Sequence, residues 1–195
     1  MTPVRVEIHP EASTPPGLRA QVLALQDQAW PPGPGEPPSA GLTHDPALEP
    51  RSVLLVDDAR VLAALDVLSK HLDHAGRVWT ASGLSTVVVD RAARGGGHGL
   101  TLVRAAARSI ETSGADLTLF TCDRPLARFY AAAGYAVLPG SVVVGGTPAA
   151  PLRSDADGFD KVTLAAFHSP RAVRAREAFV GADLALYPGD VDRLW

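Results

Sequence analysis

The segment Arg94-Gly95-Gly96-Gly97-His98-Gly99 places one arginine and four glycines between an apolar stretch and an amphipathic one. Unpaired backbone N–H groups at a helix N-terminus attract anions, and glycine lets a ligand approach the backbone closely. Arg94 adds a full positive charge and a forked donor for a phosphate oxygen. The segment therefore predicts a phosphate-binding turn between a strand and a helix.

Two other phosphate-binding motifs fit this segment poorly. A P-loop needs Lys and then Ser or Thr after its last glycine, where this chain has Leu100 and Thr101. A dinucleotide-binding fingerprint needs Gly-x-Gly-x-x-Gly early in a βαβ unit, whereas these glycines follow three apparently antiparallel strands. Nucleotide hydrolysis and nicotinamide binding are thus disfavoured, and a flexible glycine turn without a ligand is the remaining alternative.

Several other side chains could do chemistry. Tyr130 could use its hydroxyl, or it could be a core aromatic residue beside Phe129 with that hydroxyl hydrogen-bonded. Cys122 could be a nucleophile, but no histidine stands near it in the sequence, which favours a small buried residue. His71 and His74 lie near a turn and could relay a proton, although a surface role is favoured.

Composition indicates one compact domain spanning residues 1–195, because 46% of the residues are apolar and 20% are charged. The net charge of −3 and the absence of a basic stripe argue against a nucleic-acid partner. The single cysteine excludes an internal disulfide and a Cys-rich zinc module, and we expect no metal. With no apolar run near the ~20 residues of a membrane span, the chain is expected to be soluble and cytoplasmic.

The first half of the chain predicts strands and one helix. Alternation predicts a strand from Val4 to Ile8, and helical spacing from Leu18 to Trp30 predicts a helix. The proline-rich segment that follows is either an inert connection or one wall of a substrate opening. Breaks at 57–59 and 73–76 divide the next apolar run into three antiparallel strands. We interpret the middle segment as a strand, although its Ala and Leu residues favour a helix.

The second half alternates helices and strands. The β-branched triplet Val87-Val88-Val89 predicts a buried strand before the glycines, and Leu100 to Ile110 show the spacing of an amphipathic helix. The remaining predicted elements are a strand at 117–121, a short helix around 126–130, a strand at 135–138, a Gly/Pro/Ala-rich loop at 141–152, an acidic turn, a strand at 161–167 and a helix at 171–179.

The glycine segment resembles the GNAT acyltransferases, whose pattern here is Arg-Gly-x-Gly-x-Gly or Ala after an apolar strand. The family also carries a short helix ending in Tyr, followed by Gly and an aromatic residue, which matches Phe129-Tyr130-Ala131-Ala132-Ala133-Gly134-Tyr135. The resemblance implies an α/β (α+β) fold with a mixed, twisted sheet of six to seven strands and helices on both faces. It also implies a splay between two strands that admits the pantetheine of acetyl-CoA.

The resemblance assigns roles to individual residues. Tyr130 becomes the general acid for the thiolate, and a backbone N–H near Val89 contacts the thioester carbonyl. Acetyl-CoA is the expected donor, a small-molecule primary amine the acceptor, and a homodimer the expected assembly. The expected cofactor-binding residues are Val87, Val88, Val89, Arg94, Gly95, Gly96, Gly97, His98, Gly99 and Leu100.

The whole chain resembles the aminoglycoside 2′-N-acetyltransferase branch of this superfamily. Shared features are the acidic turn Asp155-Ala156-Asp157-Gly158, the segment Gly189-Asp190-Val191 and a C-terminal Trp195. The resemblance implies that residues 170–195 contribute to the acceptor site and that antibiotic resistance is the role. The expected acceptor contacts are Glu36, Thr86, Thr121, Asp123, Asp155, Asp157, Asp190 and Trp195.

The chain departs from this branch at several positions. Ser85 stands where the family has a glutamate in the strand before the phosphate turn, so the family's carboxylate base or amine contact is missing and Ser85 is the catalytic candidate at this position. The early acidic loop is replaced by the proline-rich segment, in which Glu36 is the only acid. Three functions remain open: an aminoglycoside acetyltransferase, a GNAT enzyme for another amine, and a non-catalytic acyl-CoA-binding or regulatory module.

Overall fold

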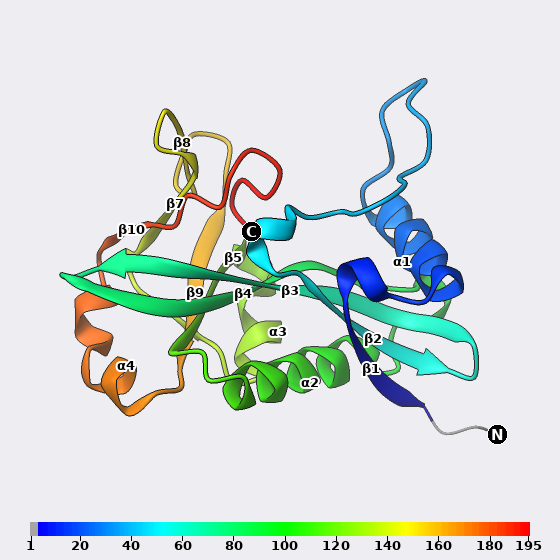
Figure 1. The fold of residues 1–195 in the computed structure, drawn as a ribbon, viewed down its shortest axis with the longest axis horizontal. Helices are drawn as coiled ribbons and strands as arrows, with labels where there is room; N and C mark the ends of the chain where they lie inside the picture. The colour runs from blue at the N-terminus through cyan, green and yellow to red at the C-terminus, as the bar shows by residue number, and fades with distance from the viewer. Residues whose placement is uncertain (1–3) are drawn as a thin grey trace.

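A seven-stranded mixed sheet forms the centre of the protein in the computed structural model, which describes residues 4–195 (Figure 1). Its strand order is β1-β2-β3-β4-β5-β9-β6, and only β4 and β5 run parallel. The strands are β1 (Arg5–Pro10), β2 (Arg51–Asp57), β3 (Arg60–His74), β4 (Arg77–Val89), β5 (Leu117–Asp123), β6 (Ala136–Val137) and β9 (Lys161–Phe167).

Helices cover both faces of this sheet, as expected. Alternation along β2 shows it: Leu54 and Val56 pack with α1, whereas Val53 and Leu55 belong to the core beneath α2. The helices are α1 (Pro16–Ala29), α2 (His98–Thr112), α3 (Ala127–Ala131) and α4 (Pro170–Arg174), with 3-10 turns at Glu11–Ser13, Pro46–Leu48, Arg91–Ala93, Arg124–Leu126 and Arg176–Phe179.

The three predicted antiparallel strands are confirmed. The β2–β3 register runs from Arg51 opposite Val67 to Asp57 opposite Arg60, and the β3–β4 register ends at His74 opposite Arg77. The middle segment is a strand because buried side chains fill both of its faces, which a one-sided helix could not achieve. Tertiary burial thus outweighs the helix propensity of its Ala and Leu.

A second sheet, with strand order β10-β7-β8, was not predicted. The segment 141–152 was expected to be a loop, and this was wrong: it forms the antiparallel pair β7 (Val142–Thr147) and β8 (Ala150–Arg153), and β10 (Asp183–Ala185) adds a parallel strand. The three valines at 142–144 favour a strand. The glycines that suggested a loop serve close packing, since a Cβ on Gly145 would lie 1.8 Å from the carbonyl oxygen of Arg193.

Smaller boundaries also differ from the prediction. The helix expected from Arg171 to Phe179 is broken at Ala175, so that α4 has one short α-helical segment and a 3-10 turn follows it. The predicted strand from Tyr135 to Leu138 shortens to β6, whose two residues pair with β9. Both elements are short, and their ends depend on tertiary contacts more than on local pattern.

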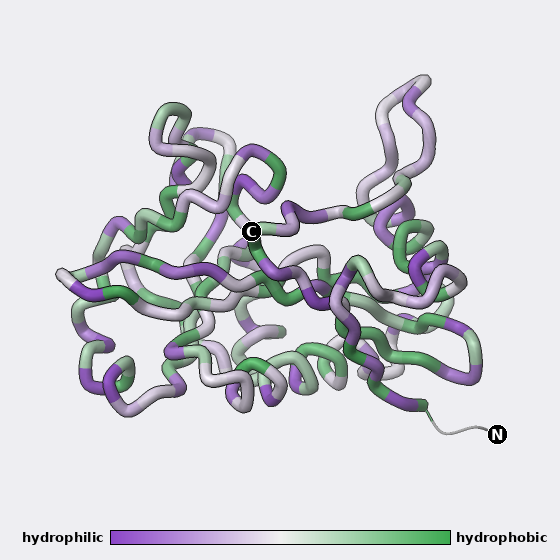
Figure 2. Tube along the Cα trace, viewed as in Figure 1, coloured by the Kyte–Doolittle hydropathy of each residue, from purple (hydrophilic) through white to green (hydrophobic). Residues whose placement is uncertain are grey.

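The hydropathy of the chain follows this architecture (Figure 2). Apolar residues concentrate along the central strands, whereas the proline-rich segment after α1 is mostly polar or neutral and projects from the body (Figures 1 and 2). Within residues 4–195, no helix has both the length and the hydropathy that crossing a bilayer requires.

Candidate active site

The parallel strands β4 and β5 separate soon after they meet. Their pairing is limited to Ala81 opposite Leu117 and Ser82 opposite Thr118. Beyond that point the backbone groups of β4 and β5 that face each other have no ladder partners, so they are open to side chains or a ligand. The structure therefore contains a splay where the resemblance implied one.

The indole of Trp195 fills the base of this splay. Its Nε1 donates a hydrogen bond of 2.9 Å to the carbonyl oxygen of Leu119 on β5, and the residue is 7% exposed. On the β4 side, Gly83 leaves the space that the ring occupies. The C-terminal segment thus replaces a stretch of the missing β4–β5 ladder.

Substitution of Gly83 by alanine should expel Trp195 from the splay. The new Cβ would lie 2.5 Å from Trp195 Nε1 and 2.8 Å from the Leu119 carbonyl oxygen, so one of these groups must move. We expect a loss of about 1–3 kcal/mol in the free energy of unfolding, typical of overpacking. Chemical denaturation of Gly83→Ala, in the wild type and in Trp195→Ala, measures this loss. If Gly83→Ala cost the same free energy in both backgrounds, the close contact with Trp195 would be contradicted.

A groove of about 460 Å³ lies beside the glycine turn. It is lined by the end of β4, the turn itself, the start of α2 and the α3 region, and nine of the ten predicted cofactor residues border it: Val87, Val88, Val89, Arg94, Gly95, Gly97, His98, Gly99 and Leu100. Gly96 is the one that does not border it. The glycine turn and the strand before it therefore face one common space.

The glycines of this turn are needed for different structural reasons. Gly97 is the N-cap of α2 with φ of 75°, and no side chain caps the helix, so its first N–H groups are available to an anion. Gly99 allows α2 to approach β4, because a Cβ there would lie 3.1 Å from Val89 Cγ2. Arg94 is exposed beside this helix end. These features together form an anion-binding arrangement.

A second cavity, of about 290 Å³, opens at the splay itself. Six of the predicted catalytic and acceptor residues line it: Ser85, Thr86, Thr121, Asp123, Tyr130 and Trp195. Lys161 also lines it and forms a 3.0 Å ion pair with Asp123. The cavity therefore combines hydroxyl groups, one paired carboxylate and aromatic walls.

Tyr130 lies where the groove and the splay cavity meet. Val87, Leu126 and Tyr130 line both. The Tyr130 ring packs edge-to-face on Phe120 and Phe129, each with 5.0 Å between ring centroids. Burial, with smaller effects of Cys122 and Asp123, raises the pKa of Tyr130 well above its usual range. Its hydroxyl is thus held in the protonated form at the junction.

Cys122 is a buried thiol and not an activated one. It is 5% exposed, and burial raises the pKa of the thiol to about 11. A nucleophilic cysteine needs the opposite shift, since the thiolate is the reactive form. The expectation of a small buried residue agrees with this environment.

Four predicted acceptor residues do not line the splay cavity: Glu36, Asp155, Asp157 and Asp190. The Glu36 carboxylate accepts from the Gly33 backbone N–H within the proline-rich segment. Asp155 pairs with Arg153 at 2.9 Å, and Arg153 also pairs with Asp183. Asp190 is exposed. The structure thus brings together the predicted residues of β4, β5 and α3, but not the acidic ones of the loops.

Beneath the cavity lies a buried ion cluster that the sequence analysis did not identify, formed by His44, Asp66 and Asp192. His44 Nδ1 contacts Asp192 Oδ1, and His44 Nε2 lies 3.2 Å from Asp66 Oδ2. All three side chains are at most 6% exposed. Asp192 also accepts from the backbone N–H of Asp45 at 3.0 Å. The cluster ties the C-terminal segment to the centre of the sheet.

The charges of this cluster stabilise one another. Burial alone would lower the pKa of His44, but hydrogen bonds to Asp192 and Asp66 outweigh it and raise that pKa to about 9. Burial likewise opposes ionisation of Asp66, yet His44 and two hydroxyl groups hold its pKa below the usual value. At neutral pH a histidinium therefore lies between two carboxylates.

Thr86 connects the ion cluster to the cavity wall. It has φ of 50°, a left-handed conformation that is unfavourable for a β-branched residue. Its Oγ1 donates a 2.7 Å hydrogen bond to Asp66 Oδ2, and the β3–β4 register shifts between Ala64 and Asp66. The bond holds a strained bulge where β4 leaves β5, which is typical of functional sites.

Part of the ion cluster had a detectable signal. Asp66 is a lone carboxylate in an otherwise apolar stretch of β3, and a buried charge requires a partner. Its partner could not be located from the sequence, because His44 lies in the segment between α1 and β2 and Asp192 is 148 positions from His44. Only the fold brings these three residues together.

The chain was compared with known proteins. No family model matches it, and no curated protein does. Solved structures do match. One is an acyl-CoA N-acyltransferase from Pseudomonas aeruginosa, with a TM-score of 0.55 and 16% identity, covering 84% of this chain and 99% of that one. Another is ElaA from Escherichia coli, with a TM-score of 0.56 and 15% identity over 84% and 99%.

A GCN5-related N-acetyltransferase from Anabaena variabilis also matches, with a TM-score of 0.52 and 17% identity, over 69% of this chain and 33% of that one. At such low identity the likeness shows a common fold. The chain has a mixed seven-stranded sheet in which one parallel pair splays beside a glycine-rich helix N-terminus. It thus shares the GNAT fold with these solved structures.

Proposed function

We propose that this protein transfers an acetyl group from acetyl-CoA to a primary amine of a small polar molecule. One observation carries the proposal: the groove beside the anion-binding turn and the cavity in the β4–β5 splay meet at Tyr130. In this arrangement the pyrophosphate would lie at the start of α2 near Arg94, and the thioester would lie near Val87 to Val89. The acceptor amine would enter the splay cavity.

The reaction proposed is direct transfer. The amine nitrogen attacks the thioester carbonyl carbon, a C–N bond forms, and the C–S bond breaks to release the thiolate of CoA. Free N–H groups of β4 near Val89 would stabilise the oxygen as it gains negative charge. The Tyr130 hydroxyl, which lies where the groove and the splay cavity meet, would donate its proton to the thiolate sulfur as the C–S bond breaks.

The amine must lose its proton to become a nucleophile. Ser85 borders the cavity but has no carboxylate, and Asp123, the only acidic side chain among the residues that line it, is paired with Lys161. We therefore propose that water accepts the proton of the amine. This assignment favours acceptors with a low amine pKa, because a larger fraction of them is neutral at pH 7.

The cavity also bears on the class of acceptor. A polycation requires several unpaired carboxylates that converge on it. The only acidic side chain that lines the splay cavity, Asp123, is paired with Lys161, and Asp155 is paired with Arg153. An amine with a single positive charge fits these charges better than an aminoglycoside, which remains the substrate that the resemblance suggests.

The proposal is tested by release of the CoA thiol from acetyl-CoA in the presence of acceptor amines. The panel comprises aminoglycosides, aminosugars with one amine, short polyamines, amino acids and peptide N-termini, each at several pH values. We expect release with at least one amine that carries a single charge, and a rate that rises with pH as that amine loses its proton. Release with aminoglycosides alone would overturn the acceptor assignment.

Binding of the donor is tested separately from turnover. Arg94→Ala should weaken acetyl-CoA binding about tenfold in calorimetry, because it removes a charge-assisted contact to a phosphate. Arg108→Ala is the matched control, since Arg108 is an exposed arginine of α2 that does not line the groove. Equal affinities of the two variants would contradict the placement of the pyrophosphate.

A second candidate function is a non-catalytic acyl-CoA-binding module. The observation that favours it is that Asp123, the only acidic side chain that lines the splay cavity, is paired with Lys161. Such a module would bind acetyl-CoA with the affinity that Arg94 confers, yet no amine in the panel would stimulate thiol release. It would also be indifferent to replacement of the Tyr130 hydroxyl.

A further inference from the structure

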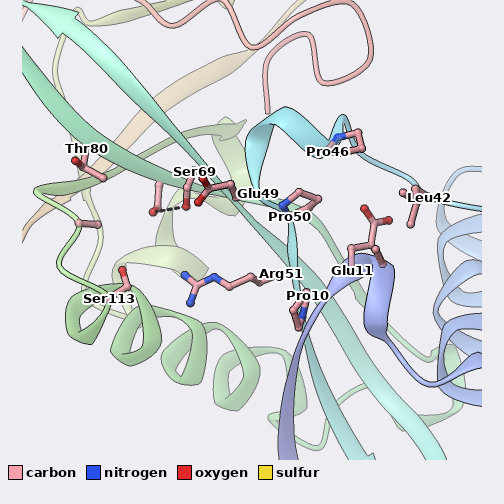
Figure 3. A pocket seen from close by; sticks show the side chains of 13 residues that line it. Pro10, Glu11, Leu42, Pro46, Glu49, Pro50, Arg51, Ser69, Thr80 and Ser113 are labelled. Carbon is pink, nitrogen blue, oxygen red and sulfur yellow. Dashed lines mark hydrogen bonds between the residues drawn. The ribbon is translucent and has the colours of Figure 1, made fainter.

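A cavity of about 540 Å³ lies outside the site described above, on the α2 face of the sheet (Figure 3). It is bounded by the end of β1, the start of β2, the β3–β4 pair and the residues that follow α2. It shares no lining residue with the groove or the splay cavity. Its volume is within the range of small-molecule sites, about 300–1,000 Å³.

Arg51 is the cation of this cavity. Its side chain extends across the cavity from β2 toward the end of α2, where Ser113 lies (Figure 3). Among residues 4–195, only Arg19 and Arg51 are arginines that are not exposed, and Arg19 is paired with Glu11 at 2.7 Å. Arg51 forms no ion pair with any of residues 4–195, and its one hydrogen bond there, to Ser109 Oγ, is long at 3.5 Å.

Hydroxyl groups on the opposite wall complete the polar lining. Ser69 of β3 and Ser82 of β4 are cross-strand partners whose Oγ atoms lie 3.0 Å apart, and Ser82 is only 1% exposed. Thr80, two residues before Ser82 on the same face of β4, also lines the cavity. A partly buried guanidinium therefore lines the same cavity as a sheet surface rich in hydroxyl groups.

The rest of the lining selects the kind of anion. Pro10, Leu42, Pro46 and Pro50 supply an apolar wall beside Arg51. Two acidic residues also line the cavity: Glu11, which is paired with Arg19, and Glu49, whose negative charge disfavours a dianion such as phosphate. A planar monoanion matches the fork of a single guanidinium, and an apolar body matches the prolines.

We propose that this cavity is a second ligand site, which binds a small organic carboxylate through Arg51 and the Ser69–Ser82 pair with its apolar portion on the proline wall. The site is independent of acetyl transfer and would exist in either function considered above. Ser82 also belongs to the last β4–β5 pair before the splay. A ligand here would therefore contact the strand that leads into the reaction site.

The test is binding to the full chain saturated with CoA, measured by NMR with amide chemical shifts as the readout. The probes are straight and branched carboxylic acids of two to six carbons, their uncharged amides, the corresponding primary amines and inorganic phosphate. We expect saturable shifts at Ser69, Ser82 and Ser113 with carboxylates, and none there with amides, amines or phosphate. Shifts confined to 85–87 and 121–123, or binding of phosphate in preference to carboxylates, would overturn the proposal.

Two variants assign the binding to Arg51. Arg51→Gln should weaken carboxylate binding at least tenfold, and Arg51→Lys, which keeps the charge without the planar fork, should weaken it less. Arg108→Gln is the control on the neighbouring helix and should bind like the wild type. If Arg51→Gln fails to fold, Arg51→Lys serves as the test. The site would be refuted if Arg51→Lys bound carboxylates as tightly as the wild type and bound the uncharged amides equally well.

Discussion

Replacement of Tyr130 by phenylalanine should reduce kcat for acetyl transfer by about a hundredfold or more, the usual range for loss of a general acid. Acetyl-CoA affinity should change less than twofold, because the ring remains in place between Phe120 and Phe129. Stopped thiol-release assays and calorimetry on the same preparation give both quantities. The split arises because the hydroxyl would act on the leaving thiolate and not on bound acetyl-CoA.

The control for this variant is Tyr135→Phe. Tyr135 is also buried and packs on Phe120 at 5.0 Å, but it lines neither the groove nor the splay cavity. It should keep its turnover. If Tyr130→Phe and Tyr135→Phe retain the same activity, Tyr130 is a packing residue, and the acid must be water or another group.

Loss of His44 should change both the stability of the protein and its pH dependence. Because the pKa of His44 rises from 6.5 to about 9 on folding, its contribution is complete below pH 6.5 and disappears as the pH rises through 9. At 1.36 kcal/mol per pH unit, this corresponds to about 3 kcal/mol. Urea denaturation at pH 6 to 10 should show this decline in the wild type.

His44→Gln should lose most of this decline and be less stable at pH 7, by about 3–5 kcal/mol, because two buried carboxylates then lack their cation. His71→Gln, at an exposed position on the same sheet, is the control and should match the wild type. A wild-type curve that is flat between pH 6.5 and 9 would contradict a charged His44. So would a parallel slope in His44→Gln.

The sequence predicted the elements whose patterns are local. The glycine turn, the amphipathic α2 and the three hairpin strands each have their signal within one segment, and the family resemblance linked them into the correct fold. The β7–β8 pair was missed because Gly145 was interpreted as loop flexibility, whereas its small size is required by Arg193, far along the chain. Contacts between distant segments leave no local periodicity.

The candidate site divides in the same way. Most residues that line the groove and the splay cavity lie on β4, β5, α2, α3 and the glycine turn, and their positions follow from the predicted fold, whereas Lys161 comes from β9. Loop residues such as Asp155 depend on partners that sequence cannot provide, here Arg153. His44 and Arg51 had no motif at all, and their environments emerge only from the packing of separate segments.

The buried ion cluster has a consequence for how the chain reaches its native state. Asp66 pairs with His44, and His44 pairs in turn with Asp192 of the C-terminal segment, so a sheet that forms before this segment arrives holds the histidine with only one of its two carboxylates. His44 and Asp192 are 148 positions apart, and contacts between such distant residues form slowly, because the entropy of closing the loop is lost before the contact stabilises the chain. Docking of Asp192 should therefore be a late step, and chains arrested before it would expose the open splay to association with other chains.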